Sequence, residues 1–150
     1  MKTDELVVLV VEDDSTDVLM IRRAFKKSQI TSPLHVVDNG DAAVDYLSGR
    51  PPYHDRTVYP LPAVILLDLK LPRRSGLEVL EWLRQQPGLR RLPVVVLTSS
   101  MESTDVRKAY DLGCNSYLVK PVSFEGLLDA VKALGVYWLL LNRKPDTEVA

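Results

Sequence analysis

The sequence predicts an α/β protein with a doubly wound, five-stranded parallel sheet, a (βα)5 sandwich. Two patterns carry this prediction. Short runs of β-branched and aliphatic residues alternate along the chain with segments whose apolar residues recur at helical spacing. The first run, LVVLVV at 6–11, is also apolar without interruption, as expected of a strand that is buried on both faces of its sheet.

Strands and helices are expected in strict alternation. The first strand precedes a helix over 15–28, in which Val18, Ile21 and Phe25 share one face. The other strands are expected at 34–37, 63–67, 94–97 and 116–119, and the other helices at 41–47, 76–85, 103–112 and 123–141. The proline-rich segment 50–62, between the second helix and the third strand, is expected to be a loop.

Composition argues against several classes of function. The formal net charge of −1 gives no strong positive field for nucleic acid, and the single cysteine, Cys114, rules out an internal disulfide. The N-terminal segment lacks the pattern of a signal peptide, and no apolar run approaches membrane-spanning length. We expect one cytoplasmic domain over 1–150, with a core at about 5–141 and a polar tail at 142–150, that binds neither nucleic acid nor a membrane.

Polar residues follow four of the predicted strands at the point where each strand ends. They are Glu12 and Asp13 after the first strand, Asp68 after the third, Thr98 after the fourth and Lys120 after the fifth. Most of them, taken singly, would be helix caps, turn formers or surface residues. Because the carboxyl ends of parallel strands lie at one edge of the sheet, where ligands bind, we expect these side chains to form one site.

The charges of this predicted site favour phosphoryl chemistry with a metal ion. Three carboxylates this close together need a neutralising cation, and Mg²⁺ is the cation that prefers such oxygen ligands. Lys120 adds a compact positive charge. Asp68 would then be the nucleophile that forms an aspartyl phosphate, while magnesium, Lys120 and Thr98 contact the phosphoryl oxygens.

The sequence resembles the receiver domain of two-component response regulators over about residues 5–140. The segments that carry the resemblance are VVLVVEDD, LLDLKLPRRSG, VVVLTSS and SYLVKP. The resemblance implies a flavodoxin-like fold with strand order 2-1-3-4-5, as in the chemotaxis response regulator. It also implies that Asp68 is the phosphoacceptor, in a signalling protein that promotes its own phosphorylation and dephosphorylation rather than an enzyme.

The resemblance assigns further roles. The implied magnesium ligands are Glu12, Asp13, Asp68 and the backbone carbonyl of Lys70. Thr98 and Tyr117 would form a switch pair, in which the hydroxyl moves toward the phosphate and the ring turns inward. The peptide bond between Lys120 and Pro121 is expected to be cis. The acidic pair is Glu-Asp rather than the commoner Asp-Asp, so that Glu12 could reach the metal through water.

Two other segments are similar to those of small stand-alone response regulators that pair with cyanobacterial phytochromes: 50–62 and GVYWLLLNRKP at 135–145. They imply a sensor histidine kinase, here a phytochrome, as the phosphodonor. The output would be binding to a partner or within a dimer, or relay of the phosphate to a histidine phosphotransfer protein.

The apolar run after Gly135 predicts a homodimer, because the core can cover only one side of a helix. The predicted interface residues are Val136, Tyr137, Trp138 and Leu140. The alternative is that this end of the helix folds back onto its own sheet.

Two other classes of function remain open at this point. Haloacid-dehalogenase-like phosphatases also use an aspartate nucleophile, magnesium, a hydroxyl residue and a lysine. Their nucleophile closes the first strand, and a second aspartate follows two residues later, whereas Asp68 closes the third strand and is followed by Lys70. A flavodoxin-like nucleotide-binding protein would cradle phosphate in loops rich in Ser, Thr and Gly, but the first loop, VEDDSTD, is acidic.

Overall fold

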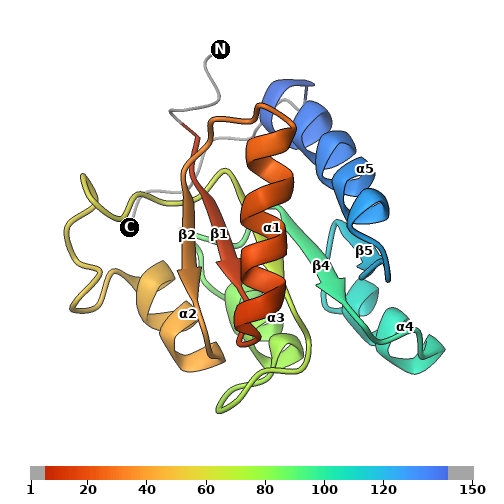
Figure 1. Ribbon diagram of the computed structural model, residues 1–150. Coiled ribbons are helices and arrows are strands. Elements are labelled where there is room, and N and C mark those ends of the chain that lie inside the picture. Colours follow the sequence, from red (N-terminus) through yellow and green to blue (C-terminus); the bar gives the residue numbers. More distant parts are fainter. Residues whose placement is uncertain (1–5, 142–150) are drawn as a thin grey trace.

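The computed structural model describes residues 6–141, which form one five-stranded parallel sheet with helices on both faces (Figure 1). The strands lie in the order β2-β1-β3-β4-β5, as predicted. The strands are β1 Val8–Val11, β2 Leu34–Val37, β3 Val64–Leu67, β4 Val94–Thr98 and β5 Ser116–Val119. The helices are α1 Ser15–Lys27, α2 Gly40–Ser48, α3 Gly76–Arg84, α4 Ser103–Asp111, α5 Phe124–Leu134 and the π-helix η2 Gly135–Leu141.

The central strands are buried on both faces, which explains their unbroken apolar sequences. In β1, Leu9 and Val11 belong to the core beneath α2, α3 and α4, whereas Val8 and Val10 belong to the core beneath α1 and α5. Side chains of a strand alternate between its two faces, so each of these cores receives every second residue. The sheet therefore has no solvated face along β1, and polar groups are confined to the strand ends.

Side-chain caps set the start of several helices. Asp14 accepts hydrogen bonds from the backbone N–H groups of Thr16 and Asp17 and begins α1. Ser123 does the same for α5 through the N–H of Gly126. An added Cβ at Gly126 would lie 2.9 Å from the Cβ of Pro121, so this glycine permits the close approach of α5 to the end of β5.

The prediction of one long helix over 123–141 is wrong in its last third. The α-helix ends at Leu134, and Gly135–Leu141 forms a π-helical segment. Gly135 packs against Ile30, so closely that an added Cβ would lie 2.3 Å from its Cδ1 atom. Leu139 is buried in the core beneath α1 and α5, and Trp138 packs against the same core. This end of the chain therefore folds back onto its own sheet.

The expected cis bond between Lys120 and Pro121 is also wrong. Within residues 6–141 the one cis peptide bond joins Pro51 to Pro52. The segment 50–62 is a loop, as predicted, and Arg56 holds it by donating hydrogen bonds to the carbonyls of Tyr46, Leu47 and Tyr59. No helix in the described part of the chain combines the length and the apolar character that crossing a bilayer would require.

Candidate functional site

The predicted site residues gather at the carboxyl ends of the strands. Val11 of β1 pairs in register with Leu67 of β3, which places Glu12 and Asp68 side by side, one residue further on. The backbone N–H of Asp68 donates to the carbonyl of Val11, and that of Lys120 to the carbonyl of Thr98, so both residues extend the hydrogen bonding of the sheet. The sheet therefore fixes the backbone beneath the site.

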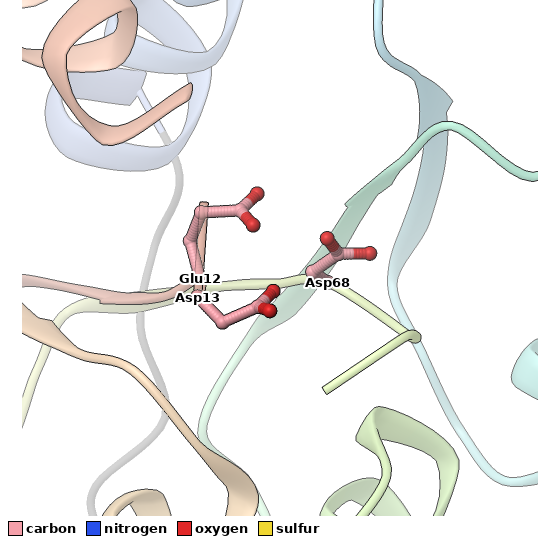
Figure 2. A group of neighbouring side chains, drawn as sticks. All are labelled: Glu12, Asp13 and Asp68. Atoms are coloured by element: carbon pink, nitrogen blue, oxygen red, sulfur yellow. The ribbon is translucent and has the colours of Figure 1, made fainter. Parts of the chain in front are cut away.

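Three carboxylates form the acidic part of the site. Oxygen atoms of Glu12, Asp13 and Asp68 all lie within 4.8 Å of one another (Figure 2). Glu12 and Asp68 are buried, whereas Asp13 is exposed to solvent. A set of hard carboxylate oxygens with one side open to water suits a divalent cation such as Mg²⁺ or Mn²⁺, which takes few protein carboxylates and retains several waters.

Lys120 supplies the positive charge. Its Nζ atom lies 2.5 Å from Glu12 Oε1, 2.7 Å from Asp17 Oδ2 and 3.0 Å from Asp68 Oδ2. An ammonium group has three N–H donors, so each one has a carboxylate acceptor. Sequence reasoning missed Asp17, because an acidic residue in the first turn of a helix is usually there to interact with the helix dipole.

The environment sets the charge states of these groups. Burial raises the pKa of Glu12 to about 7, against the lowering effect of Lys120 and of the N–H of Asp14. Burial would also raise the pKa of Asp68, but hydrogen bonds from Thr98 and Lys120 outweigh it and hold that pKa below its usual value. Burial opposes the charge on Lys120, yet its three carboxylate partners raise its pKa. Asp68 is therefore an ionised carboxylate beside a charged ammonium group.

The proposed switch residues meet through Ser100. Thr98 is fully buried, and its hydroxyl accepts a long hydrogen bond, 3.5 Å, from the N–H of Ser100. The hydroxyl of Tyr117 donates to the carbonyl of Ser100 at 3.0 Å, and the Ser100 hydroxyl donates to Asp105 Oδ2 at 2.6 Å. Ser100 therefore connects Thr98, beside Asp68, with α4 and β5, a connection that the sequence did not indicate.

The backbone of the loop after β3 also contacts Asp68. The N–H of Lys70 lies 3.3 Å from Asp68 Oδ1 and donates to it. The N–H of Gly76 donates to the carbonyl of Leu69 at 2.9 Å, which folds the start of α3 against the end of β3. An added Cβ at Gly76 would lie 2.1 Å from the Asp68 carbonyl oxygen, so the packing here requires glycine.

Two of the four predicted dimer residues, Tyr137 and Trp138, have side chains that the structure describes. Tyr137 is 52% exposed, and its ring makes an edge-on contact with that of Trp138 at a centroid distance of 5.0 Å. Trp138 itself packs partly against the core of its own chain. The side chains of Val136 and Leu140 lie outside the described residues. The homodimer accordingly stays a prediction.

Comparison with known proteins defines the class. The family model of the response regulator receiver domain matches residues 8–132, and the chain belongs to this family. It is therefore a two-component signalling protein with a receiver domain, a kind of domain that implies a phosphodonor kinase as partner. The haloacid-dehalogenase-like and nucleotide-binding alternatives gain no support from the family match. Receiver domains are signalling modules rather than typical enzymes.

Three known proteins are similar to this chain over most of its length. Response regulator Rcp1 of Synechocystis sp. is 38% identical over 133 residues, which are 89% of this chain and 88% of Rcp1. The probable methanogenesis regulatory protein FilR2 of Methanothrix harundinacea is 42% identical over 142 residues, 95% of this chain and 89% of FilR2. The crystal structure of RcpA, a phosphorylated cyanobacterial phytochrome response regulator, superposes with a TM-score of 0.87 at 33% identity, covering 94% of this chain and 99% of RcpA.

A structure of Rcp1 contains a divalent metal ion. This Mn²⁺-bound form superposes with a TM-score of 0.84 at 37% identity, covering 93% of this chain and 99% of that one. A divalent metal in this relative agrees with the Glu12, Asp13 and Asp68 oxygens found here. The resemblance to phytochrome response regulators is thereby confirmed, and so is the receiver fold.

Proposed function

We propose that this chain is a single-domain, cytoplasmic response regulator that accepts a phosphoryl group from a sensor histidine kinase on Asp68. One observation carries the proposal: Asp68 is a buried, ionised carboxylate placed between a possible metal ligand set and the ammonium group of Lys120. A carboxylate in this state has a free electron pair for attack on phosphorus, and cations on two sides to stabilise the product.

Magnesium is the proposed resident metal. Glu12, Asp13, Asp68 and the backbone carbonyl of Lys70 would hold it, and its charge would neutralise the oxygens of the transferred group. The donor set fits, because the three carboxylates present hard oxygen atoms within 4.8 Å of one another and Asp13 is open to solvent. Glu12, with its raised pKa, would bind as a carboxylate directly or through water.

The residues of the chain would act as follows. One carboxylate oxygen of Asp68 forms a bond to phosphorus while the bond from phosphorus to the donor's histidine nitrogen breaks, and that nitrogen retains the electron pair. Lys120 donates to a phosphoryl oxygen, which replaces part of its contact with Asp68. Thr98 donates its hydroxyl to another phosphoryl oxygen. The same groups would promote the later attack of water that removes the phosphate.

The output would begin with Thr98 and Tyr117. When the Thr98 hydroxyl turns toward the phosphate, the N–H of Ser100 loses its acceptor, and the loop that also binds the Tyr117 hydroxyl is freed to move. Tyr117 would then turn inward. The change at β5 and α4 would alter binding to a partner, or alter a homodimer formed through Tyr137 and its neighbours in η2.

A phytochrome is the proposed phosphodonor. RcpA is a cyanobacterial phytochrome response regulator, and its likeness extends over 94% of this chain. A histidine phosphotransfer protein would be the acceptor if the phosphate is relayed onward. Transfer from a phytochrome kinase to this chain, tested beside an unrelated histidine kinase, distinguishes the cognate donor.

Intact mass after incubation with acetyl phosphate and Mg²⁺ tests the chemistry. We expect one added phosphoryl group in the wild type, none in Asp68→Ala, and none when Mg²⁺ is replaced by a chelator. Asp111→Ala is the matched control, because Asp111 is an exposed aspartate at the last residue of α4, before β5 begins at the opposite edge of the sheet. An adduct that persists in Asp68→Ala, or no adduct in the wild type, would refute the proposed function.

A further inference from the structure

Asp17 binds Lys120 although it stands outside the group of carboxylates that surrounds Asp68. Its Oδ2 atom lies 2.7 Å from Lys120 Nζ, a shorter contact than the 3.0 Å between Lys120 and Asp68. The two residues are 103 positions apart in the sequence, and their contact joins the first turn of α1 to the end of β5. Asp14 caps α1 and accepts a hydrogen bond from the N–H of Asp17, which fixes the backbone of Asp17.

The other two partners of Lys120 have competing tasks. Glu12 and Asp68 are proposed metal ligands, and Asp68 also receives the phosphoryl group. Metal binding or phosphorylation would therefore engage the carboxylate oxygens of Glu12 and Asp68 that now accept hydrogen bonds from Lys120. Asp17 belongs to no group of metal-ligating residues in the described part of the chain. It is the carboxylate that Lys120 can keep when its other two partners are engaged.

The surroundings of Lys120 offer few replacements for Asp17. Lys120 and Asp17 border a cavity of about 150 Å³ between α1 and the start of α5. Its walls are mostly apolar and include Met20, Ile21, Leu97, Val122, Phe124 and Leu127. An ammonium group that loses a charged acceptor beside such walls must find water or move, because an unpaired charge next to apolar surface is costly.

We infer that Asp17 is a positioning residue, which holds the ammonium group of Lys120 beside Asp68 when Glu12 and Asp68 are engaged by metal or phosphate. Its importance for phosphoryl transfer rests on the proposed function. The contact itself does not, and can be tested separately. Without Asp17, Lys120 would leave its place in the metal-loaded protein and would no longer be ready to contact a phosphoryl oxygen.

The first experiment observes Lys120 directly. The ¹⁵N signal of the Lys120 ammonium group, assigned with Lys120→Arg, is recorded for the full chain without and with saturating Mg²⁺. Asp17→Ala, the isosteric Asp17→Asn and the charge-conserving Asp17→Glu are compared with Glu125→Ala. Glu125 is an exposed acidic residue in the first turn of α5 and matches Asp17 in its relation to a helix N-terminus.

We expect a protected Lys120 signal that persists with Mg²⁺ in the wild type, Asp17→Glu and Glu125→Ala. In Asp17→Ala and Asp17→Asn the signal should be lost on adding Mg²⁺. Amide spectra check that each variant is folded. If Asp17→Ala does not fold, the result for Asp17→Asn is used to test the inference. A signal that persists with Mg²⁺ in the folded Asp17 variant, or one that disappears in the wild type, would overturn the inference.

The second experiment measures initial rates of phosphorylation by acetyl phosphate over a range of Mg²⁺ concentrations. At saturating Mg²⁺ we expect Asp17→Ala to be about tenfold slower than Glu125→Ala, the effect of losing one charge-assisted hydrogen bond. The Mg²⁺ concentration at half-maximal rate should not change, and Asp17→Glu should recover most of the rate. Equal rates in Asp17→Ala and Glu125→Ala would overturn the inference. If the wild type takes no phosphate, the proposed function fails, and the Lys120 signal still decides the role of Asp17.

Discussion

Replacing Gly76 with alanine should damage the proposed phosphoacceptor site without removing any of its polar groups. The new Cβ would lie 2.1 Å from the carbonyl oxygen of Asp68 and 2.7 Å from the Cα of Leu69. Non-bonded heavy atoms prefer separations of about 3.5 Å, so the start of α3 and the end of β3 must move apart by roughly 1 Å. The obstructing atoms are backbone atoms of Asp68 and Leu69, and no side chain can rotate away to relieve the overlap.

Two quantities should change. Overpacking of this kind costs about 1–3 kcal/mol in the free energy of unfolding. A reacting group displaced by about 1 Å can lose about a hundredfold in rate. We therefore expect Gly76→Ala to unfold at lower urea concentration and to take phosphate from acetyl phosphate tenfold to a hundredfold more slowly, by rough estimate from the same displacement.

Gly135→Ala is the matched control. Its added Cβ would also be crowded, at 2.3 Å from the Cδ1 atom of Ile30, but Ile30 precedes β2 and lies at the opposite edge of the sheet from Asp68. This variant should keep its rate, and its stability should change little, because the Cδ1 end of Ile30 can rotate away and Gly135 has ordinary helical backbone angles. If Gly76→Ala keeps both its stability and its rate, the close approach at Asp68 is not a constraint. If Gly135→Ala slows phosphorylation as much, the effect is one of general packing.

Three further predictions concern stability, each measured by urea unfolding. Arg84→Met should lose about 2 kcal/mol, because the half-buried guanidinium donates to several carbonyls, that of Gly113 at 2.7 Å among them, which would lose this donor. Lys120→Met should lose about 3–5 kcal/mol without metal, since it leaves buried carboxylates unpaired, and Mg²⁺ should recover part of the loss. Burial raises the pKa of Tyr46 from 10.0 to about 12, so the wild type should lose stability as pH rises through this interval. Tyr46→Phe should lose less there, and should cost about 1 kcal/mol at neutral pH because it leaves the Pro60 carbonyl unpaired.

The sequence was sufficient to predict the fold and the assembly of the site at one edge of the sheet. In a parallel sheet every strand ends on the same side, so a polar residue after an apolar run is placed by topology alone. Glu12, Asp68 and Lys120 are of this kind, and each directly follows a strand. Their neighbourhood is determined by strand register, which the hydrophobic pattern specifies.

The parts that sequence reasoning missed depend on how helices pack. The contact between Asp17 and Lys120 requires a particular placement of α1 beside β5, and the link through Ser100 requires a particular turn after β4. The helical pattern of α5 likewise continues through Gly135, but the chain widens there into a π-helix and buries Leu139 against its own core. An apolar run shows that a surface must be covered, but it does not show whether the same chain or a partner covers it.

Asp68 can be buried as a charged group at the end of β3 because neighbouring side chains stabilise its ionised form. Lys120 and Thr98 stabilise the ionised form of Asp68 and lower its pKa, while Glu12, equally buried, has its pKa raised to about 7. Two buried carboxylates share the ammonium group of Lys120. The unfavourable effect of burial on the ionised form is therefore larger for Glu12 than for Asp68. Because a metal ligand must bind in its ionised form, a divalent cation that enters here near neutral pH would displace a proton from Glu12, whereas the lowered pKa of Asp68 keeps that carboxylate ionised without metal.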